Sequence, residues 1–472
     1  MARKKKLIKG LLITDIADKG KAMGKTEDGQ VVFVDGVVPG DIVDVLILRK
    51  KKNYAEGVID QIVKFSDARI KPTCDHFGAC GGCKWQNLQY EAQLKFKEKV
   101  VKDAMLRIAK LQNDVVKPIV GCEHIFQYRN KLEYSSSTKR WLTKEEIVTS
   151  NEILDAHGAL GFHKSGFFDK IVSIDECLLQ ESFTNTLRNF VRAYIEDNQL
   201  TMYDIRQHSG FLRNIVVRNT TDGQWMVIMV FGENDTEHIE NLMNTLKTNF
   251  NEVTSLYYVV NTKFNDTTFD LDYHLWYGMP YIAQSLGNVK YKIGPKSFFQ
   301  TNPRQAENLY NIAVKYAEIK PTDTVYDLYT GLGSIALYVS GSAHQVIGIE
   351  EIPEAIEDAK INADYNEIHN AIFYAGDVKE ILNKTFFYHH AKADVVITDP
   401  PRAGMHTEVV ETLLNLEAHR IVYISCNPAT QARDLQLLSA KYDVDEVTPV
   451  DMFPHTHHIE SVAKLTLKSS LS

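Results

Sequence analysis

The chain has 472 residues, 44% of them hydrophobic and 24% charged, which is the composition of a globular protein with a sizeable core and roughly two to four domains. It contains no run of about 18 apolar residues, which excludes a membrane-spanning helix. The charged N-terminus lacks the apolar stretch of a secretory signal, so we expect a cytoplasmic protein.

The net charge of −8 is unevenly distributed along the chain. Residues 1–110 hold 22 Lys and Arg against 14 Asp and Glu, whereas the rest of the chain holds 31 against 47. A basic N-terminal part on an acidic body suggests that this part meets a polyanion such as nucleic acid. The alternative is a solvated surface whose charge is merely uneven.

The first 63 residues predict a small β-barrel with a surface suited to nucleic acid. Residues 1–9 form an expected basic arm, with cations at Arg3, Lys4, Lys5, Lys6 and Lys9. Short β-rich runs such as Val31–Val34 and Ile42–Ile47 follow, separated by glycine-rich turns, and this pattern is typical of a small β-barrel. The basic turn Lys50–Tyr54 adds an aromatic ring, a combination suited to single-stranded nucleic acid.

A cysteine-rich loop comes next, with Cys74, Cys80 and Cys83 spaced as Cys-x-x-x-x-x-Cys-Gly-Gly-Cys. Three thiolates so close in sequence can converge on one metal centre, and both zinc and an iron–sulfur cluster are compatible with them. A fourth ligand would be Cys122 or Cys177, and spacing alone does not choose between them. Disulfides are unlikely, because they are rare in the cytosol. The alternative to a metal centre is three cysteines with unrelated roles.

Residues 88–285 predict a mixed region. Apolar positions at helical spacing indicate a helix from Leu88 to Leu111, and residues 120–285 are rich in expected strands. Two segments, Tyr128–Lys131 and Lys164–Phe168, combine cations with aromatic rings. Such segments suit RNA contact, although most of them are surface packing.

After about Lys290 strands and helices alternate, which predicts a doubly wound parallel sheet. The expected strands are Thr324–Tyr329, Gln345–Glu350, Val395–Thr398 and Ile421–Ser425. Between the first two lies a loop with Gly331 and Gly333, and Glu350 follows Gly331 by 19 residues. This order predicts a nucleoside-containing ligand whose ribose meets Glu350. S-adenosylmethionine (SAM) fits better than NAD or ATP, because a third glycine and a phosphate-binding Lys are absent; the alternative is a structural turn.

Two more candidate residues follow expected strand ends, and a third enters the last expected strand. Asp399 begins Asp-Pro-Pro-Arg, Cys426 lies in Ser-Cys-Asn-Pro, and Glu460 closes His-His-Ile-Glu. A thiol and a carboxylate at the carboxyl ends of such strands suit a nucleophile and a base. Taken singly, the three residues are compatible with a helix cap, a buried structural thiol and a surface carboxylate. An attacking thiol would be expected to have a cation or a helix N-terminus nearby.

These motifs together resemble the RNA 5-methyluridine methyltransferases, in particular the iron–sulfur branch that acts on 23S ribosomal RNA. The resemblance includes Val38-Pro39-Gly40-Asp41, the cysteine loop, Ser-Phe-Phe-Gln ending at Gln300, Asp-Pro-Pro-Arg, Ser-Cys-Asn-Pro and the closing His-Ile-Glu. It implies a TRAM-like barrel over 1–63 and a mixed α+β central domain with the iron–sulfur loop over 64–285. A SAM-dependent, Rossmann-like α/β catalytic domain is implied over 286–472.

The resemblance also implies roles for particular residues. Gln300, Tyr329, Glu350 and Asp399 would contact SAM, Cys426 would be the nucleophile and Glu460 the base. A [4Fe-4S] cluster would be held by Cys74, Cys80, Cys83 and Cys177, leaving Cys122 spare. Thr330 and Ser334 depart from the family pattern, which affects only fine cofactor contacts.

The implied reaction is methylation of carbon 5 of a uridine in 23S ribosomal RNA through a covalent bond between Cys426 and uracil C6. Methylation of transfer RNA is an alternative, and amino-group methylation through the Asp-Pro-Pro-Arg loop is another. A noncatalytic RNA-binding factor with an inherited SAM fold is the third.

Overall fold

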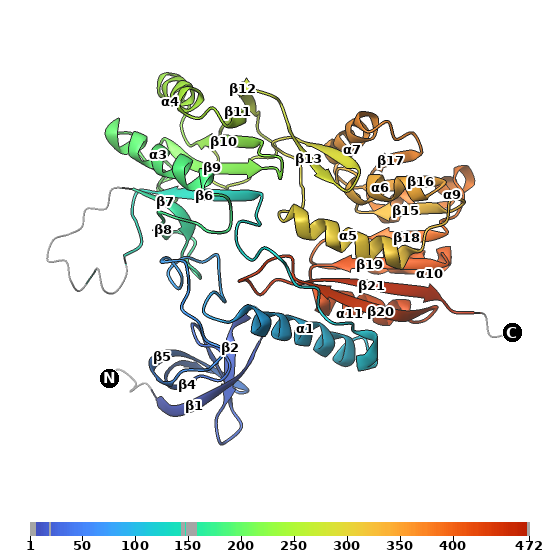
Figure 1. Ribbon diagram of the computed structural model, residues 1–472, viewed down its shortest axis with the longest axis horizontal. Helices are drawn as coiled ribbons and strands as arrows, with labels where there is room; N and C mark the ends of the chain where they lie inside the picture. The colour runs from blue at the N-terminus through green and yellow to red at the C-terminus, as the bar shows by residue number, and fades with distance from the viewer. Residues whose placement is uncertain (1–5, 18–19, 143–146, 148–157, 470–472) are drawn as a thin grey trace.

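The protein is described here from a computed structural model, which covers residues 6–17, 20–142, 147 and 158–469. Figure 1 shows three bodies in chain order: a barrel in blue, a sheet with helices in green, and a second sheet with helices in yellow to red. Arg3, Lys4 and Lys5 of the expected basic arm lie outside the described residues. Lys9 does not belong to an arm, because the first strand begins at Leu7.

The N-terminal body is a closed barrel with the strand order β1-β2-β3-β5-β4, as the sequence predicts. Its strands are β1 (Leu7–Ile16), β2 (Ala22–Lys25), β3 (Val31–Val34), β4 (Ile42–Lys50) and β5 (Tyr54–Lys64). Asp41 explains the Val-Pro-Gly-Asp motif, because its buried carboxylate accepts the Val38 amide at 2.8 Å and closes the turn. In the Lys50–Tyr54 turn, the Lys51 ammonium lies 5.4 Å from the Tyr54 ring centre.

The central body is a seven-stranded sheet in the order β12-β11-β10-β9-β6-β7-β8. Its elements are β6 (Lys131–Ser137), β7 (Ala159–His163), β8 (Ile171–Ser173), α3 (Phe183–Asp197), β9 (Leu212–Asn219), β10 (Trp225–Phe231), α4 (Thr236–Asn249), β11 (Val253–Val260) and β12 (His274–Gly278). Before it come α1 (Tyr90–Arg107) and the 3-10 helix η2 (Asn113–Val115). The helix expected over 88–111 is thus present but shorter at both ends.

The C-terminal body is built on a second seven-stranded sheet, in the order β17-β16-β15-β18-β19-β21-β20. Its strands are β15 (Thr324–Leu328), β16 (Gln345–Glu350), β17 (Ala371–Ala375), β18 (Val395–Thr398), β19 (Arg420–Ser425), β20 (Tyr442–Val450) and β21 (Glu460–Leu467). The expectation of a fully parallel sheet is wrong at β21, which runs antiparallel to both β19 and β20. Because β21 runs in the opposite direction, its first residue lies at the edge of the sheet where the parallel strands end.

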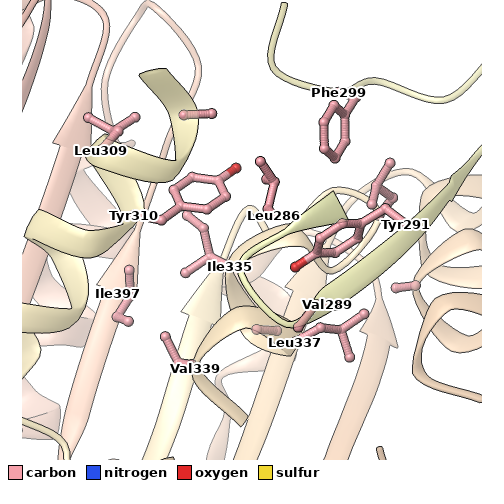
Figure 2. Close-up of a cluster of buried hydrophobic side chains, with 14 of the residues drawn as sticks. Leu286, Val289, Tyr291, Phe299, Leu309, Tyr310, Ile335, Leu337, Val339 and Ile397 are labelled. Carbon is pink, nitrogen blue, oxygen red and sulfur yellow. The ribbon is translucent and has the colours of Figure 1, made fainter. Parts of the chain in front are cut away.

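Helices cover both faces of this sheet. They are α5 (Pro303–Ala317), α6 (Ser334–Val339), the 3-10 helix η3 (Ser340–Ser342), α7 (Pro353–Tyr365), α8 (Val378–Ile381), α9 (Lys384–His389), α10 (Thr407–Leu416) and α11 (Pro428–Leu438). One face packs on α5, α6, α7 and the hairpin β13 (Ile282–Leu286)–β14 (Val289–Ile293), whose buried side chains appear in Figure 2. The other face packs on α10, α11 and α1, so α1 lies against the C-terminal body.

Local sequence signals explain two of the helix starts that matter below. Asn302 caps α5 by accepting the Gln305 amide, and Asn427 caps α11 by accepting the Ala429 amide. A proline follows each cap, at a position where a missing N–H costs no helical hydrogen bond. Among the described residues, no helix is both long and apolar enough to cross a membrane.

Candidate active site

The glycine loop joins β15 to α6 at the carboxyl edge of the sheet. Tyr329, Gly331 and Gly333 all have positive φ angles, of 65°, 57° and 82°. The Glu350 carboxylate accepts the Gly331 amide and the Ile352 amide, each at 3.1 Å. Glu350 therefore has a fixed position beside the loop, as the sequence predicts for a ribose-binding acid at the end of the second strand.

Asp327 lies beneath this loop and is fully buried. One of its oxygens accepts the Thr330 hydroxyl at 2.5 Å and the Ala336 amide at 2.9 Å. The other oxygen, Oδ1, has no hydrogen-bond partner among the described residues. Burial raises the pKa of the Asp327 carboxyl to about 7. Thr330, one of the departures from the family pattern, thus stabilises the base of the loop.

The Asp-Pro-Pro-Arg loop leaves β18 next to the glycine loop. The Asp399 amide donates to the Leu328 carbonyl at 3.3 Å, which joins the two loops. The Asn427 side chain donates to the Arg402 carbonyl at 3.1 Å, which joins this loop to the segment that carries Cys426. Although Asp399 keeps some exposed surface, the dense surroundings raise the pKa of its carboxyl to about 7.

Cys426 lies at the end of β19, directly before the cap of α11, and is partly exposed. Burial, and secondarily the carboxylates of Glu460 and Asp399, raises the pKa of its thiol to about 11. Arg402 is the expected neighbouring cation and acts in the opposite direction, but it is outweighed. The expected cation and helix N-terminus therefore both lie near Cys426, but burial and the two carboxylates keep the pKa of its thiol raised.

Glu460 begins β21 and is buried, with 7% of its surface exposed. The next residue, Ser461, pairs with Ser425 of β19, so the antiparallel strand brings Glu460 beside Cys426. Burial, and secondarily Asp399, raises the pKa of the Glu460 carboxyl well above its usual value. One thiol and two acids with raised pKa values thus lie together at the carboxyl edge of the sheet.

Gln300 lies on the loop before α5 and is partly exposed. Its carbonyl accepts the Asn130 side chain at 3.1 Å, and the Asn130 amide donates to the Thr301 carbonyl at 2.8 Å. The start of the central sheet therefore fixes the backbone of this predicted SAM-binding segment. Among the described residues, the Gln300 side chain itself makes no hydrogen bond to Cys426 or Glu460.

Cys74, Cys80, Cys83 and Cys177 all line one cavity of about 230 Å³. All six cysteines of the chain are free thiols. Burial raises the pKa of Cys80 to about 11 and that of Cys83 to about 12, and the neighbouring cysteines add to both shifts. Cys122 lies elsewhere and donates its S–H to the His124 carbonyl. Among the described residues, no three His, Cys, Asp or Glu side chains are arranged to hold a single metal ion.

Close packing of the cysteine loop against β7 explains one of its glycines. The Gly81 amide donates to the His163 carbonyl at 3.0 Å, and a Cβ at Gly81 would lie 2.5 Å from that oxygen. Lys164, in the second predicted cation–aromatic segment, donates to the Gly78 carbonyl at 2.6 Å. This second segment therefore supports the cysteine loop. In the first segment, Tyr128 is buried and its hydroxyl donates a hydrogen bond to the Pro454 carbonyl.

Sequence reasoning missed the loop from Asp451 to Ile459, which connects the cysteine cavity to Glu460. Thr456 and His458 line the cavity, four and two residues before the β21 carboxylate. The side chains of Lys97 and Gln93 on α1 bind this loop at Asp451, Phe453 and His455. No local signal predicts these contacts, because the two partners are about 350 residues apart in sequence.

Comparison with known proteins gives consistent matches. Residues 219–468 match the family described as tRNA (uracil-5-)-methyltransferase, and residues 9–59 match the TRAM domain. Uncharacterized RNA methyltransferases of Bacteroides thetaiotaomicron and Porphyromonas gingivalis are 49% and 47% identical to the chain; each match covers 96% of this chain and 100% and 98% of the relative.

A solved structure, the Pyrococcus abyssi tRNA (uracil-54, C5)-methyltransferase in complex with S-adenosyl-L-homocysteine, matches with a TM-score of 0.75 and 31% identity. The match covers 97% of this chain and 100% of that one. These comparisons confirm the expected barrel as a TRAM domain and the C-terminal body as a SAM-dependent methyltransferase fold.

Proposed function

We propose, from the premise that this chain belongs to the tRNA (uracil-5-)-methyltransferase family and is a SAM-dependent RNA methyltransferase, that it methylates carbon 5 of a uridine through a covalent intermediate. The observation that carries the proposal is the convergence of Cys426, Glu460 and Asp399 at the carboxyl edge of the sheet. Ligands bind at this edge in open α/β sheets. Methylation of an amino group would need no thiol there.

The proposed reaction begins when the Cys426 thiolate adds to C6 of the uracil. The electron pair of the C5–C6 bond moves toward C4 and its oxygen, and the resulting enolate attacks the methyl carbon of SAM through C5. The bond from that methyl group to sulfur breaks, and the sulfur keeps its electrons. Glu460 then removes the proton from C5, the C6–sulfur bond breaks, and the thiolate is restored. Because the uracil must leave its stack, an RNA loop that is already open lowers the cost.

The raised thiol pKa fits this order of events. At a pKa of about 11, the Cys426 thiol is almost entirely protonated near neutral pH, so it is inert until substrate arrives. The positive charge of the SAM sulfonium would offset the negative charge of the carboxylates, and would therefore lower the pKa of the Cys426 thiol. Glu350, Tyr329, Gln300 and Asp399 are the residues that we assign to SAM, with Glu350 already oriented by the glycine loop.

We assign the four-cysteine cavity to a [4Fe-4S] cluster. A cluster of several metal ions is larger than one ion, so its ligands surround a cavity instead of meeting at one point. Burial, and then mutual repulsion, raises the thiol pKa values, and cationic iron would oppose both effects, since metal ligation favours thiolates. The cluster would stabilise this region, because the proposed methyl transfer involves no electron transfer.

The RNA class has two candidates. The cysteine loop and the motif set favour 23S ribosomal RNA, whereas the Pyrococcus abyssi relative, which acts on uridine 54 of transfer RNA, favours transfer RNA. Mapping 5-methyluridine in both RNA classes, from cells with and without the gene, distinguishes them. Loss from 23S RNA supports the first candidate, and loss from transfer RNA alone supports the second.

The decisive test of the chemistry compares Cys426→Ala with Cys122→Ala. Cys122 is a buried thiol that hydrogen-bonds Asn302 and the His124 carbonyl and, in the part of the chain that the structure describes, has no hydrogen bond to Cys426 or Glu460, so its variant controls for loss of a cysteine. The Cys426 variant should lose methyl transfer and lose the covalent complex with 5-fluorouridine-substituted RNA, while still binding SAM. Retained turnover in Cys426→Ala, or no trapped complex at that thiol in the unmodified enzyme, would contradict the mechanism.

A further inference from the structure

Two cations face each other across neighbouring strands of the central sheet. Lys131, the first residue of β6, is the direct cross-strand partner of Arg218 on β9. Like charges in this arrangement destabilise an antiparallel pair, so strand pairing does not explain the presence of both. Their position suggests that something anionic offsets the repulsion.

The two cations differ in their hydrogen bonds. Arg218 is buried, with 6% of its surface exposed, and donates to the Gly294 carbonyl at 2.9 Å and the Ser297 carbonyl at 2.5 Å. The Lys131 ammonium is half-buried and has no hydrogen bond, ion pair or ring contact among the described residues. Burial, and then Arg218, lowers the pKa of Lys131. An ammonium in this position is costly unless it receives an acceptor from outside the chain.

Nearby acids do not neutralise the pair. Glu133 is exposed on the same face of β6, two residues further along, and forms no ion pair with Lys131. Asp358 accepts the Ser297 hydroxyl at 2.5 Å. A third cation, Arg129, also lies close enough to lower the Lys131 pKa. The local charge is therefore positive.

The pair lies beside the proposed active site. Leu132 and Tyr134 point into the core of the central sheet, so Lys131 is on the opposite face. On that face Val216, one strand over, packs against the core shared with the catalytic domain. Asn130, the residue before Lys131, holds the Gln300 and Thr301 carbonyls. Lys131 thus borders the segment that we assign to SAM.

We propose that Lys131, with Arg218 behind it, binds a backbone phosphate of the RNA strand next to the target uridine. A phosphodiester supplies the missing acceptor, and a compact ammonium binds it as a point charge. The inference rests on the proposed action on RNA. The carboxylate of SAM is the other anion that could reach this segment, and the test separates the two.

The experiment compares Lys131→Ala and Lys131→Arg with a matched control, Lys290→Ala. Lys290 is exposed on β14, and only its backbone is bound, by Asn366. Binding of poly(U) is measured over a range of KCl concentrations, without SAM and without turnover. Removal of one phosphate contact should reduce the slope of log K against log [salt] by about 0.7 for single-stranded RNA. Lys131→Ala should show this reduction, Lys131→Arg should restore the slope, and the control should equal the unmodified enzyme.

Two outcomes would overturn the proposal. One is a Lys131→Ala protein whose poly(U) affinity and salt slope are unchanged. The other is unchanged RNA binding with weakened SAM binding, which would assign the anion to the SAM carboxylate. If Lys131→Ala fails to fold, Lys131→Gln keeps the size of the side chain without its charge and answers the same question. Since no turnover is measured, failure here is distinguishable from failure of carbon-5 methylation, which the thiol-trapping experiment tests.

Discussion

The Lys97 ammonium lies 2.6 Å from the Asp451 carboxylate, and both side chains are fully buried. Lys97 is on α1, whereas Asp451 directly follows β20 and precedes the loop that leads to Glu460. Lys97 also donates to the Phe453 carbonyl at 3.0 Å, and the Tyr90 hydroxyl donates to the second Asp451 oxygen at 2.9 Å. One face of α1 therefore holds the loop that delivers the proposed base to the crevice.

Replacing Lys97 by Met should destabilise the protein by about 3–5 kcal/mol, because it leaves the buried Asp451 carboxylate without its cation. The free energy of unfolding is measured by urea denaturation. Lys99→Met is the matched control on the same helix, since Lys99 is exposed and its ion pairs with Asp15 and Asp103 are worth less than about 1 kcal/mol.

The double variant Lys97→Met/Asp451→Asn should recover part of the lost stability, because it no longer buries an unpaired charge. A single Lys97→Met protein that loses less than about 1 kcal/mol would show that the pair does not hold the loop.

Replacing Glu460 by Gln should allow methyl transfer but block release of the product. Gln cannot accept the C5 proton, so the methylated RNA should remain bound to Cys426 as a complex that survives denaturation. Turnover should fall about 10²–10⁴-fold, the usual contribution of a general base. The complex is counted on a denaturing gel with uridine-containing RNA.

Glu411→Gln is the control for this substitution, because Glu411 is an exposed carboxylate on α10. Normal turnover in Glu460→Gln, or slow turnover without a trapped complex, would remove Glu460 from the role of base.

The sequence predicts the parts of the site that depend on local order. Runs of Val and Ile followed by polar residues place Glu350, Asp399 and Cys426 at strand ends, and the structure has β16 and β18 at the predicted bounds. The glycine loop is likewise predicted, because positive φ angles favour glycine at Gly331 and Gly333.

Other features depend on contacts distant in sequence and were not predictable. The residues of β21 do not encode that the strand runs antiparallel, yet this direction is what brings Glu460 to Cys426. Spacing did not choose between Cys122 and Cys177, whereas packing brings Cys177 to the other three thiols. The high thiol pKa of Cys426 also follows from tertiary burial and from carboxylates on other strands.

The cysteine cavity predicts a definite metal content. Protein purified without oxygen should contain about four iron and about four sulfide per chain, as a [4Fe-4S] cluster requires. Cys80→Ser should lose most of both, whereas Cys122→Ser should keep them, because Cys122 does not line the cavity. Iron, zinc and acid-labile sulfide are measured by elemental and colorimetric analysis. Zinc in place of iron, or equal loss in both variants, would contradict the assignment.

The raised pKa of Asp399 predicts how the stability of the ligand-free protein depends on pH. A carboxyl with a pKa of about 7 in the folded state and 3.8 when unfolded binds its proton more tightly when folded. Its favourable contribution is therefore complete below about pH 4 and is lost as the pH rises through 7. Across that range the loss amounts to about 4 kcal/mol, at roughly 1.4 kcal/mol for each unit of pKa difference.

Asp399→Asn removes this titration without changing the shape of the side chain. The variant should therefore gain stability relative to the unmodified protein as the pH rises from 4 to 8, with most of the gain between pH 5 and 7. Asp327 and Glu460 titrate in both proteins, and Asp399 helps to raise the pKa of each, so the difference between the two urea-denaturation profiles reports Asp399 together with its coupling to these two acids. A difference that stays constant across this range would mean that Asp399 ionises as freely as a solvent-exposed carboxyl. Burial in the crevice would then not control its charge.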